Sequence, residues 1–182
     1  VEEYFWRTSE KILRIARQLE YVPDDLEHLE RDMADTYFMN FSIFQSLPDT
    51  WSIDHVFPAA PLSRHGERPT LQTQIVDITC DSDGKIDRFV LADGLHDSLP
   101  VHDLRDDEDY YIGVFFVGAY QETLGDLHNL FGDANVVTIV LDGQGGFWVE
   151  HEVEGDRISE VLSYVEYDPQ DILAAFRRRV DQ

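Results

Sequence analysis

The chain has 182 residues and a formal net charge of −23 at pH 7, from 37 acidic and 14 basic side chains. Its length suits one domain of ordinary size, and a hydrophobic content of 43% is typical of a packed protein rather than a disordered one. The negative charge repels phosphate backbones and anionic lipids, which argues against nucleic acids and membrane surfaces as partners. A heavily solvated acidic surface is the simpler explanation of the charge, and attraction of cationic ligands or basic partner surfaces is the alternative.

The chain contains a single cysteine and no long apolar segment. One cysteine excludes an internal disulfide, and no run approaches the roughly 20 apolar residues of a membrane span or the pattern of a signal peptide. These features predict a cytoplasmic protein. Because the sequence begins at Val1, directly in a helical pattern and without methionine, we also expect a segment of a longer protein.

Two helices are predicted at the N-terminus. Apolar residues recur at spacings of three and four over residues 3–20, which indicates an amphipathic helix. Pro23 and the acidic residues after it suit the start of a second helix, which runs to about Met33.

The pattern then changes to one typical of strands. Residues 37–57 are rich in aromatic and β-branched side chains and are punctuated by prolines, which predicts short strands and loops. Residues 71–80 and 85–91 are predicted strands around Asp83-Gly84, a dipeptide that favours a tight hairpin turn. Residues 110–120 are apolar on both faces and predict a central strand.

The rest of the chain is predicted to alternate between helix and hairpin. A helix is expected over residues 121–131, and a second hairpin follows with its turn at residues 143–146. Two helices close the chain: Asp156 can cap the first, and Asp168-Pro169 can begin the second. Three arginines, at 177–179, then fall in the last turn, where cations complement the helix dipole.

These elements predict an α+β fold with an antiparallel β-barrel or sandwich domain between helical segments. The expected domain divisions are residues 1–35, 36–153 and 154–182.

The stretch ITCDSDGKID, residues 78–87, holds the cysteine beside three aspartates. A calcium loop with Gly84 at its sixth position would place Thr79 first and Val90 twelfth, where an oxygen ligand and a bidentate Glu are needed. The sequence therefore argues against calcium here. Zinc is disfavoured as well, because one cysteine and seven scattered histidines offer no CxxC or HxxxH pair.

Cys80 is followed directly by Asp81. A neighbouring carboxylate raises the pKa of a thiol, which disfavours a thiolate nucleophile. A protonated thiol that donates a proton, beside a carboxylate that holds a cationic group, suits the pair better. From the residues alone, a buried structural cysteine at a hairpin is a slightly better interpretation than this proton-donating thiol.

Three further positions are candidates for a site. Small residues before Tyr120 would let an anion approach the start of a helix, although a tight strand-to-helix turn is the more common explanation of such residues. His55 and His128 stand in apolar stretches, where a buried imidazole with satisfied hydrogen bonds is the simpler interpretation.

Four segments occur in an order that resembles one enzyme family. Together they resemble the C-terminal portion of biosynthetic arginine decarboxylases, which are pyridoxal-phosphate enzymes of the alanine-racemase-like class related to ornithine and diaminopimelate decarboxylases. The likeness runs from about Ala34 onward, and the helices before it resemble the end of the family's inserted helical bundle. The segments are ADTYFMNFSIFQSLPDTWSIDHVFP, DITCDSDGKID, YYIGVFFVGAYQETLGDLHNLFGD, and a tail with EGD, VLSYVEYDP and FRRRV.

The resemblance implies roles for individual residues. Cys80 matches the catalytic cysteine, which reaches into the partner subunit's active site and protonates the Cα carbanion left after CO₂ departs. Asp81 matches the acidic residue that binds the guanidinium of L-arginine, and Asp83 assists it. Tyr120 matches a tyrosine that donates to the cofactor phosphate, and His128 lies where related enzymes place a pocket-lining aromatic residue.

The family also needs a (β/α)8 barrel with a Schiff-base lysine, and no such strand-helix pattern is present. Lys11 and Lys85 are the two lysines, and neither has a barrel around it. We therefore expect the C-terminal part of an arginine decarboxylase of polyamine biosynthesis, inactive alone. Its expected partners are the missing barrel and a second protomer, and its cofactors are pyridoxal phosphate and, by resemblance, magnesium. The alternatives are a stand-alone dimerisation or regulatory domain, and a decarboxylase of lysine or ornithine.

Overall fold

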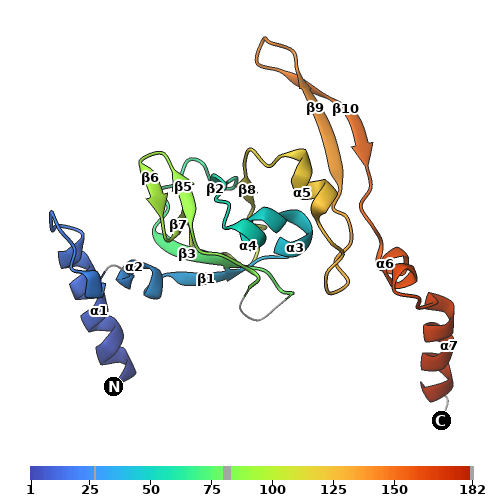
Figure 1. Ribbon diagram of the computed structural model, residues 1–182, viewed down its shortest axis with the longest axis horizontal. Coiled ribbons are helices and arrows are strands. Elements are labelled where there is room, and N and C mark those ends of the chain that lie inside the picture. Colours follow the sequence, from blue (N-terminus) through green and yellow to red (C-terminus); the bar gives the residue numbers. More distant parts are fainter. Residues whose placement is uncertain (27, 80–82, 181–182) are drawn as a thin grey trace. The chain divides into compact units, whose positions relative to one another are not determined.

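The structure, a computed structural model, describes residues 1–26, 28–79 and 83–180 (Figure 1). Its contacts divide the chain into two compact units. Unit 1 comprises Val1–Asn40 and Asp49–Gly118, and unit 2 comprises Phe41–Pro48 and Ala119–Gln182. The fold is mixed α+β, as predicted. The strands form small sheets, so the predicted barrel or sandwich is not confirmed.

Unit 1 contains the N-terminal helices and most of the strands. Its elements are α1 (Glu2–Ala16), η1 (Asp24–Leu26), α2 (Leu29–Asp32), β1 (Asp35–Phe38), α4 (Pro48–Ile53, which begins at the boundary with unit 2), β2 (Ala59–Pro61), β3 (Leu71–Val76), β4 (Lys85–Ile86), β5 (Phe89–Leu91), β6 (Gly94–His96), β7 (Leu99–Val101) and β8 (Ile112–Val114).

The first predicted helix is present as α1, but the second is broken. After Pro23 the chain makes only the 3₁₀ turn η1, in which the Leu26 N–H donates to the Pro23 carbonyl at 2.8 Å. The single turn α2 follows, and Glu30 on it pairs with Arg17 just beyond α1 at 2.6 Å. Segments this short gain too little from helix propagation to form one continuous helix.

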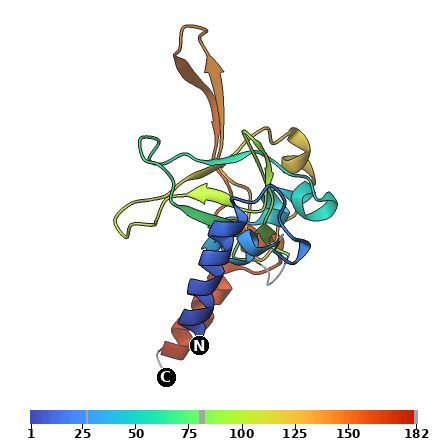
Figure 2. The ribbon, with the colours of Figure 1, turned by 90° about the vertical axis from the view of Figure 1, so that its left-hand side faces the viewer.

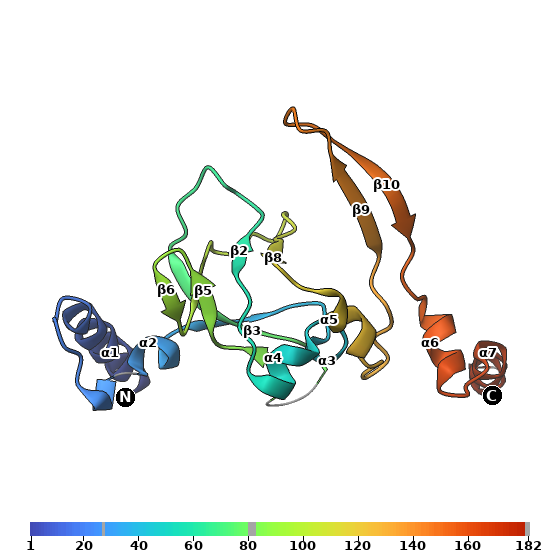
Figure 3. The ribbon, with the colours of Figure 1, turned by 45° about the horizontal axis from the view of Figure 1, so that its top comes forward.

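Strand β3 is the centre of the main sheet of unit 1. It pairs antiparallel with β4 and β7, and parallel with β1, which runs alongside it (Figure 3). The parallel pair was not predicted. It is compatible with the chain because residues 39–70, between β1 and β3, are long enough for the crossover that parallel strands need. The fully buried side chains of this unit include Thr73, Ile75, Phe89, Leu99 and Val101.

The strands predicted over residues 43–53 are wrong, because this segment forms α3 (Ile43–Ser46) and α4. The Ser42 hydroxyl accepts the Gln45 N–H at 3.3 Å and caps α3, and Pro48 occupies the first position of α4, where proline is favoured. These two start signals outweigh the aromatic and β-branched pattern.

The central strand predicted over residues 110–120 is also wrong. Of these residues only 112–114 form a strand, β8, and among the described strands it pairs with β2 alone. The chain then turns at Phe116, whose φ is 60° and whose side chain is 90% exposed. The helix predicted at 121–131 is shifted and shortened to α5 (Ala119–Leu124), and Asn129 and Leu130 adopt positive φ angles that no α-helix contains.

Unit 2 confirms the second hairpin. Strands β9 (Val136–Leu141) and β10 (Phe147–Val153) form a two-stranded ribbon, drawn in orange in Figure 2. Gly143 and Gly145 have φ angles of 73° and 93°, so the turn needs residues without a Cβ, as expected.

The C-terminal helices α6 (Ile158–Tyr164) and α7 (Pro169–Val180) are present as predicted. Asp168 caps α7 by accepting the Gln170 N–H at 2.7 Å. The cap predicted from Asp156 is wrong: its carboxylate accepts the N–H of Asp133, and Glu160 accepts the N–H that begins α6.

Candidate functional site

The loop between β3 and β4 differs from the predicted tight turn. Val76 pairs with Lys85, so the loop spans residues 77–84. Gly84 does not have the positive φ angle of a two-residue hairpin turn. Cys80 and Asp81, the two positions with the strongest functional expectation, lie outside the described residues.

Asp77 and Thr79 form the described beginning of this loop. The Asp77 side chain is only 3% exposed, and its carboxylate accepts the Thr79 N–H at 3.0 Å and the Thr79 hydroxyl at 2.6 Å. An aspartate that accepts the N–H two residues ahead is an Asx turn, and Asp-x-Thr is a sequence signal that could have been used to find it.

Gly84 forms the described end of the loop and contacts Asp77. Its carbonyl accepts the Asp77 N–H at 2.7 Å. A Cβ at this position would overlap the Asp77 carboxylate, so a glycine is needed here for space. Asp77 therefore contacts both described ends of the loop that carries Cys80.

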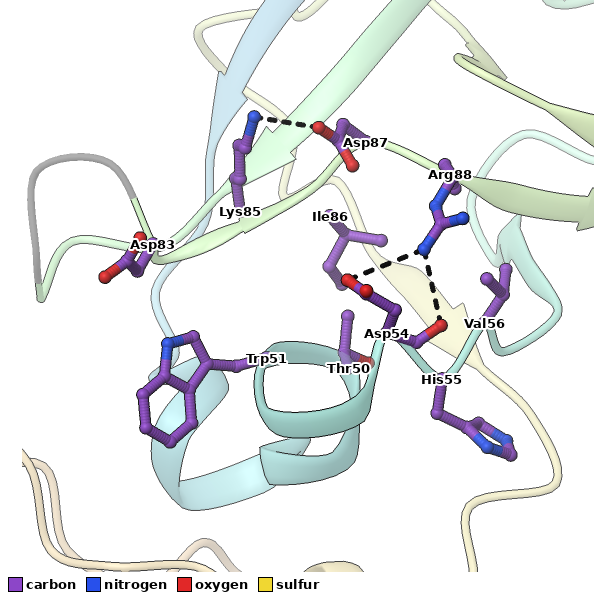
Figure 4. Close-up of a pocket in the computed structure, with 10 residues that line it drawn as sticks. All are labelled: Thr50, Trp51, Asp54, His55, Val56, Asp83, Lys85, Ile86, Asp87 and Arg88. Carbon is purple, nitrogen blue, oxygen red and sulfur yellow. Dashed lines mark hydrogen bonds and ion pairs between the residues drawn. The ribbon is translucent and has the colours of Figure 1, made fainter.

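A cavity of about 200 Å³ lies beside the loop, between α4 and the strand that follows Gly84 (Figure 4). Asp83 is exposed and lies on the loop side of the cavity. Trp51 on α4 and His55 just after it also line the space. His55 is exposed and stacks near Phe57, with ring centroids 4.3 Å apart, so the predicted buried imidazole is wrong for this residue.

The charged groups of the cavity are partly paired. Lys85 binds Asp87 at 2.8 Å, and Arg88 lies 3.6 Å from the Asp54 carboxylate (Figure 4). Among residues 1–26, 28–79 and 83–180, the Asp83 carboxylate has no ion-pair partner. The described lining therefore has one uncompensated negative charge, which suits a cationic group.

Two other predicted site residues belong to unit 2. Tyr120 lies in the first turn of α5 and is 74% exposed, so its hydroxyl is accessible to a ligand. His128 is half-buried, and its ring centroid lies 4.3 Å from that of Phe44. The buried imidazole predicted for His128 is therefore only partly present.

Sequence reasoning missed a buried histidine in unit 1. His102 is 5% exposed, and its Nδ1 lies 2.7 Å from the Tyr110 hydroxyl. The Tyr37 hydroxyl donates to the His102 carbonyl at 2.8 Å. Burial raises the pKa of Tyr37, and the negative charges of Asp35 and Asp103 add to the shift. No motif marks this cluster, because its members come from separate strands and loops.

Two classes of feature are absent from the part of the chain that the structure describes. There, no helix is long and apolar enough to cross a bilayer. Within the same residues, no group of three or more His, Cys, Asp or Glu side chains is arranged to hold a metal ion.

Known proteins resemble this chain along its whole length. Residues 158–182 match the family described as the arginine decarboxylase C-terminal helical extension. The biosynthetic arginine decarboxylase of Gloeobacter violaceus is 48% identical over 185 residues, which cover 100% of this chain and 29% of that protein. Biosynthetic arginine decarboxylase 1 of Synechocystis sp. is 50% identical, over 100% of this chain and 27% of that protein.

A solved structure agrees with these relatives. The crystal structure of the biosynthetic arginine decarboxylase of Campylobacter jejuni has a TM-score of 0.67 and 40% identity, over 81% of this chain and 24% of that one. The mixed α+β fold and the match to the helical extension thus both relate this chain to the C-terminal portion of these decarboxylases. The chain belongs to the biosynthetic arginine decarboxylases, and it spans between 27% and 29% of the length of the two relatives named above.

Proposed function

We propose that this chain is the C-terminal part of a pyridoxal-phosphate-dependent arginine decarboxylase, which converts L-arginine to agmatine and CO₂ for polyamine synthesis in the cytoplasm. The observation that carries the proposal is identity of 48% to 51% with biosynthetic arginine decarboxylases along essentially the entire chain. The chain acts with the (β/α)8 barrel portion of the protein and with a second protomer, and it is inactive alone.

Asp81 and Asp83 bind the substrate. Arginine ends in a guanidinium, whose planar fork of N–H donors forms strong, charge-assisted hydrogen bonds with carboxylates. The Asp83 carboxylate beside the cavity is exposed and has no ion-pair partner among the described residues, which supports this role for that part of the site. The excess of acidic over basic side chains, 37 against 14, adds a field that attracts a cationic substrate.

Cys80 delivers the proton that replaces CO₂ at the Cα of the substrate. A thiol has a reference pKa of about 8.5 and is therefore mostly protonated near neutral pH. Asp81, next to it in sequence, disfavours the thiolate further. The pair thus divides the work: the thiol is the acid and the carboxylate holds the cationic end of the substrate.

Pyridoxal phosphate, when bound, supplies the electron sink for loss of the carboxyl group. The fit of this chain to the cofactor is limited to its phosphate, for which the exposed Tyr120 hydroxyl is an available donor. Lys85 is ion-paired with Asp87, and Lys11 lies exposed on α1, so we place the cofactor's lysine on the barrel. His128 lines the pocket. Magnesium, which the resemblance implies, has no candidate ligand cluster among the described residues.

The test uses the full-length protein. Replacing Cys80 with Ala should lower agmatine formation by at least about 100-fold, the low end of what a general acid contributes. Asp83→Asn should mainly raise the KM for arginine. Cys80→Ser is the matched control for size. It should be little more active than Cys80→Ala, because a hydroxyl is a far weaker acid than a thiol. Unchanged agmatine formation in Cys80→Ala would remove the proposed role of Cys80.

The substrate is tested separately. Agmatine formation from arginine should exceed decarboxylation of lysine or ornithine by a wide margin in the same preparation. Preference for either of the other amino acids would contradict the proposed substrate and leave the enzyme class intact.

A further inference from the structure

The structure contains a buried carboxylate that the proposed reaction does not use. Asp77 is the first residue of the loop, lies at 3% exposure, and directs both carboxylate oxygens at Thr79. Its backbone N–H donates to the carbonyl of Gly84. One residue therefore joins the described start of the loop to its described end.

We infer that Asp77 is a positioning residue, which with Thr79 and Gly84 fixes the path by which the chain enters and leaves the segment that carries Cys80 and Asp81. This inference rests on the proposed function for its catalytic consequence. Its structural content, a link between the two ends of the loop, stands on the contacts of Asp77 alone.

The chemistry of the link explains the residue types. A buried carboxylate is costly unless hydrogen-bonded, and here two donors of Thr79 satisfy it. Both donors lie on the residue next to Cys80, so the link acts on the position that precedes the thiol. Gly84 packs on the other side of the carboxylate and has no space for a Cβ, so Asp77 cannot rotate toward it.

The contacts of Asp77 continue the hydrogen bonding of the sheet next to the loop. Val76 pairs with Lys85, and the Val76 carbonyl also accepts the Met39 N–H at 2.9 Å. The loop thus leaves a strand held from two sides, and the hydrogen bond from the Asp77 N–H to the Gly84 carbonyl extends that pairing by one residue on each side of the loop. A proton donor must lie within hydrogen-bonding reach of the reacting atom, and misplacement of about 1 Å can cost on the order of 100-fold in rate.

The experiment compares three variants in the full-length enzyme. Thr79→Val removes the hydroxyl but keeps the shape, Thr79→Ser keeps the hydroxyl, and Asp77→Asn removes the charge. We expect Thr79→Val and Asp77→Asn to lower kcat by about 10- to 100-fold, with Thr79→Ser close to the unchanged enzyme. Asp142→Asn is the matched control, because Asp142 accepts loop N–H groups in the same way in unit 2.

A second readout is independent of turnover. The rate at which iodoacetamide alkylates the Cys80 thiol, measured by peptide mass spectrometry between pH 6 and 9, reports the surroundings of that thiol. Thr79→Val and Asp77→Asn should change this rate or its pH midpoint, while Thr79→Ser and Asp142→Asn should not. Hydrogen exchange of the peptide that ends at Thr79 should rise in Thr79→Val and Asp77→Asn only. Unchanged exchange of peptides outside the loop shows that the rest of the protein is folded.

The outcomes separate the two proposals. If Cys80→Ala leaves turnover unchanged but Thr79→Val alters alkylation of Cys80, the positioning role stands and the proposed function fails. If Cys80→Ala abolishes turnover while Thr79→Val and Asp77→Asn change neither kcat nor alkylation, the proposed function stands and the inference about Asp77 is overturned.

Discussion

Two loops of this molecule are closed by the same arrangement of atoms. In the loop 77–84 the Thr79 N–H donates to the Asp77 carboxylate, and the Asp77 N–H donates to the Gly84 carbonyl. In the loop 142–146, between β9 and β10, the corresponding bonds run from the N–H of the residue two ahead to Asp142 and from the Asp142 N–H to Gly146. A Cβ on either glycine would overlap its aspartate.

The two loops differ in burial and in what completes the carboxylate's hydrogen bonds. Asp77 is 3% exposed, and a threonine hydroxyl satisfies its second oxygen. Asp142 is exposed to solvent and accepts a second backbone N–H, from Gly146. Water can replace any lost bond at Asp142 but not at Asp77. The same local motif therefore lies exposed in one loop and has a buried carboxylate in the other.

The largest effect that separates the loops should come from adding a methyl group to each glycine. Gly84→Ala should destabilise its loop by about 2 kcal/mol, because the buried Asp77 has no space to move. Gly146→Ala should cost less than about 0.5 kcal/mol, because the exposed Asp142 can rotate away. Hydrogen exchange of peptides from each loop of the full-length protein measures both local free energies.

The contact itself can be checked with a double variant. In an Asp77→Ala background the added methyl at position 84 has space. The effects of the two substitutions on loop stability should therefore be non-additive by about 1 kcal/mol or more. Equal effects of Gly84→Ala in the two backgrounds would contradict the steric explanation.

A second, smaller effect should distinguish the reasons for glycine in the two loops. Gly143 and Gly145 have positive φ angles, whereas Gly84 does not. Gly145→Ala should therefore cost about 1 to 2 kcal/mol through backbone strain, even though no atom lies within 4 Å of the added methyl. Hydrogen exchange at the tip of the hairpin measures the cost, and Gly66→Ala is a control, because Gly66 is equally open but lacks a positive φ. If Gly145→Ala changes hydrogen exchange at its tip no more than Gly66→Ala does in its own loop, the strain explanation is contradicted.

These contrasts show which features the sequence could predict. The hairpin around residues 143–146 and the proline start of α7 were predicted correctly, because their determinants are local turn and cap signals. The tight turn at Asp83-Gly84 was predicted wrongly from the same kind of signal. There Asp77, seven residues earlier than Gly84, is buried and donates its N–H to the Gly84 carbonyl, and neither this contact nor the burial of so distant a residue is visible in a turn dipeptide.

The candidate site was also only partly predictable from local patterns. The four-segment resemblance marked Cys80, Asp81 and Asp83 without any geometry, whereas the cavity beside Asp83 depends on α4, a segment that its aromatic pattern assigned to strands. Pairing of Asp54 with Arg88 across that cavity joins residues 34 positions apart, which no local pattern reports.

The loop 142–146 should also respond to acid. Hydrogen bonds from the N–H groups of Gln144 and Gly146 lower the pKa of Asp142 below its ordinary value. A lowered carboxyl pKa stabilises the hairpin turn above the unfolded-state pKa of about 3.9, and this contribution is lost as the pH falls through the folded-state pKa. Hydrogen exchange of the 142–146 amides, corrected for intrinsic rates between pH 2 and 6, should show this loss. Asp142→Asn should abolish the pH dependence, and its persistence in that variant would assign the effect to another group.

The smallest effect is expected at alkaline pH and concerns Tyr37. Here burial, rather than hydrogen bonds to a carboxylate, sets the direction of the pKa shift. Burial raises the pKa of Tyr37, with Asp35 and Asp103 adding to the shift. A raised tyrosine pKa gives a stabilising contribution that is complete below the unfolded-state pKa of about 10 and is lost as the pH rises through the folded-state value. Ionised Tyr37 can no longer donate to the His102 carbonyl, so the link from β1 to the end of β7 is lost at the same time.

Replacing Tyr37 with Phe should therefore lower stability by about 1 kcal/mol at pH 8, where the hydrogen bond is lost, and by progressively less toward pH 11. Thermal melting of the full-length protein across this range measures the difference, and ultraviolet absorbance of the phenolate identifies the group that titrates. Tyr4→Phe is the matched control, because Tyr4 is 82% exposed on α1 in the same unit and should change neither the melting temperature nor its pH dependence. A constant difference between Tyr37→Phe and the unchanged protein from pH 8 to 11 would show that the pKa of Tyr37 is the same in the folded and unfolded states, which would contradict the rise attributed to burial.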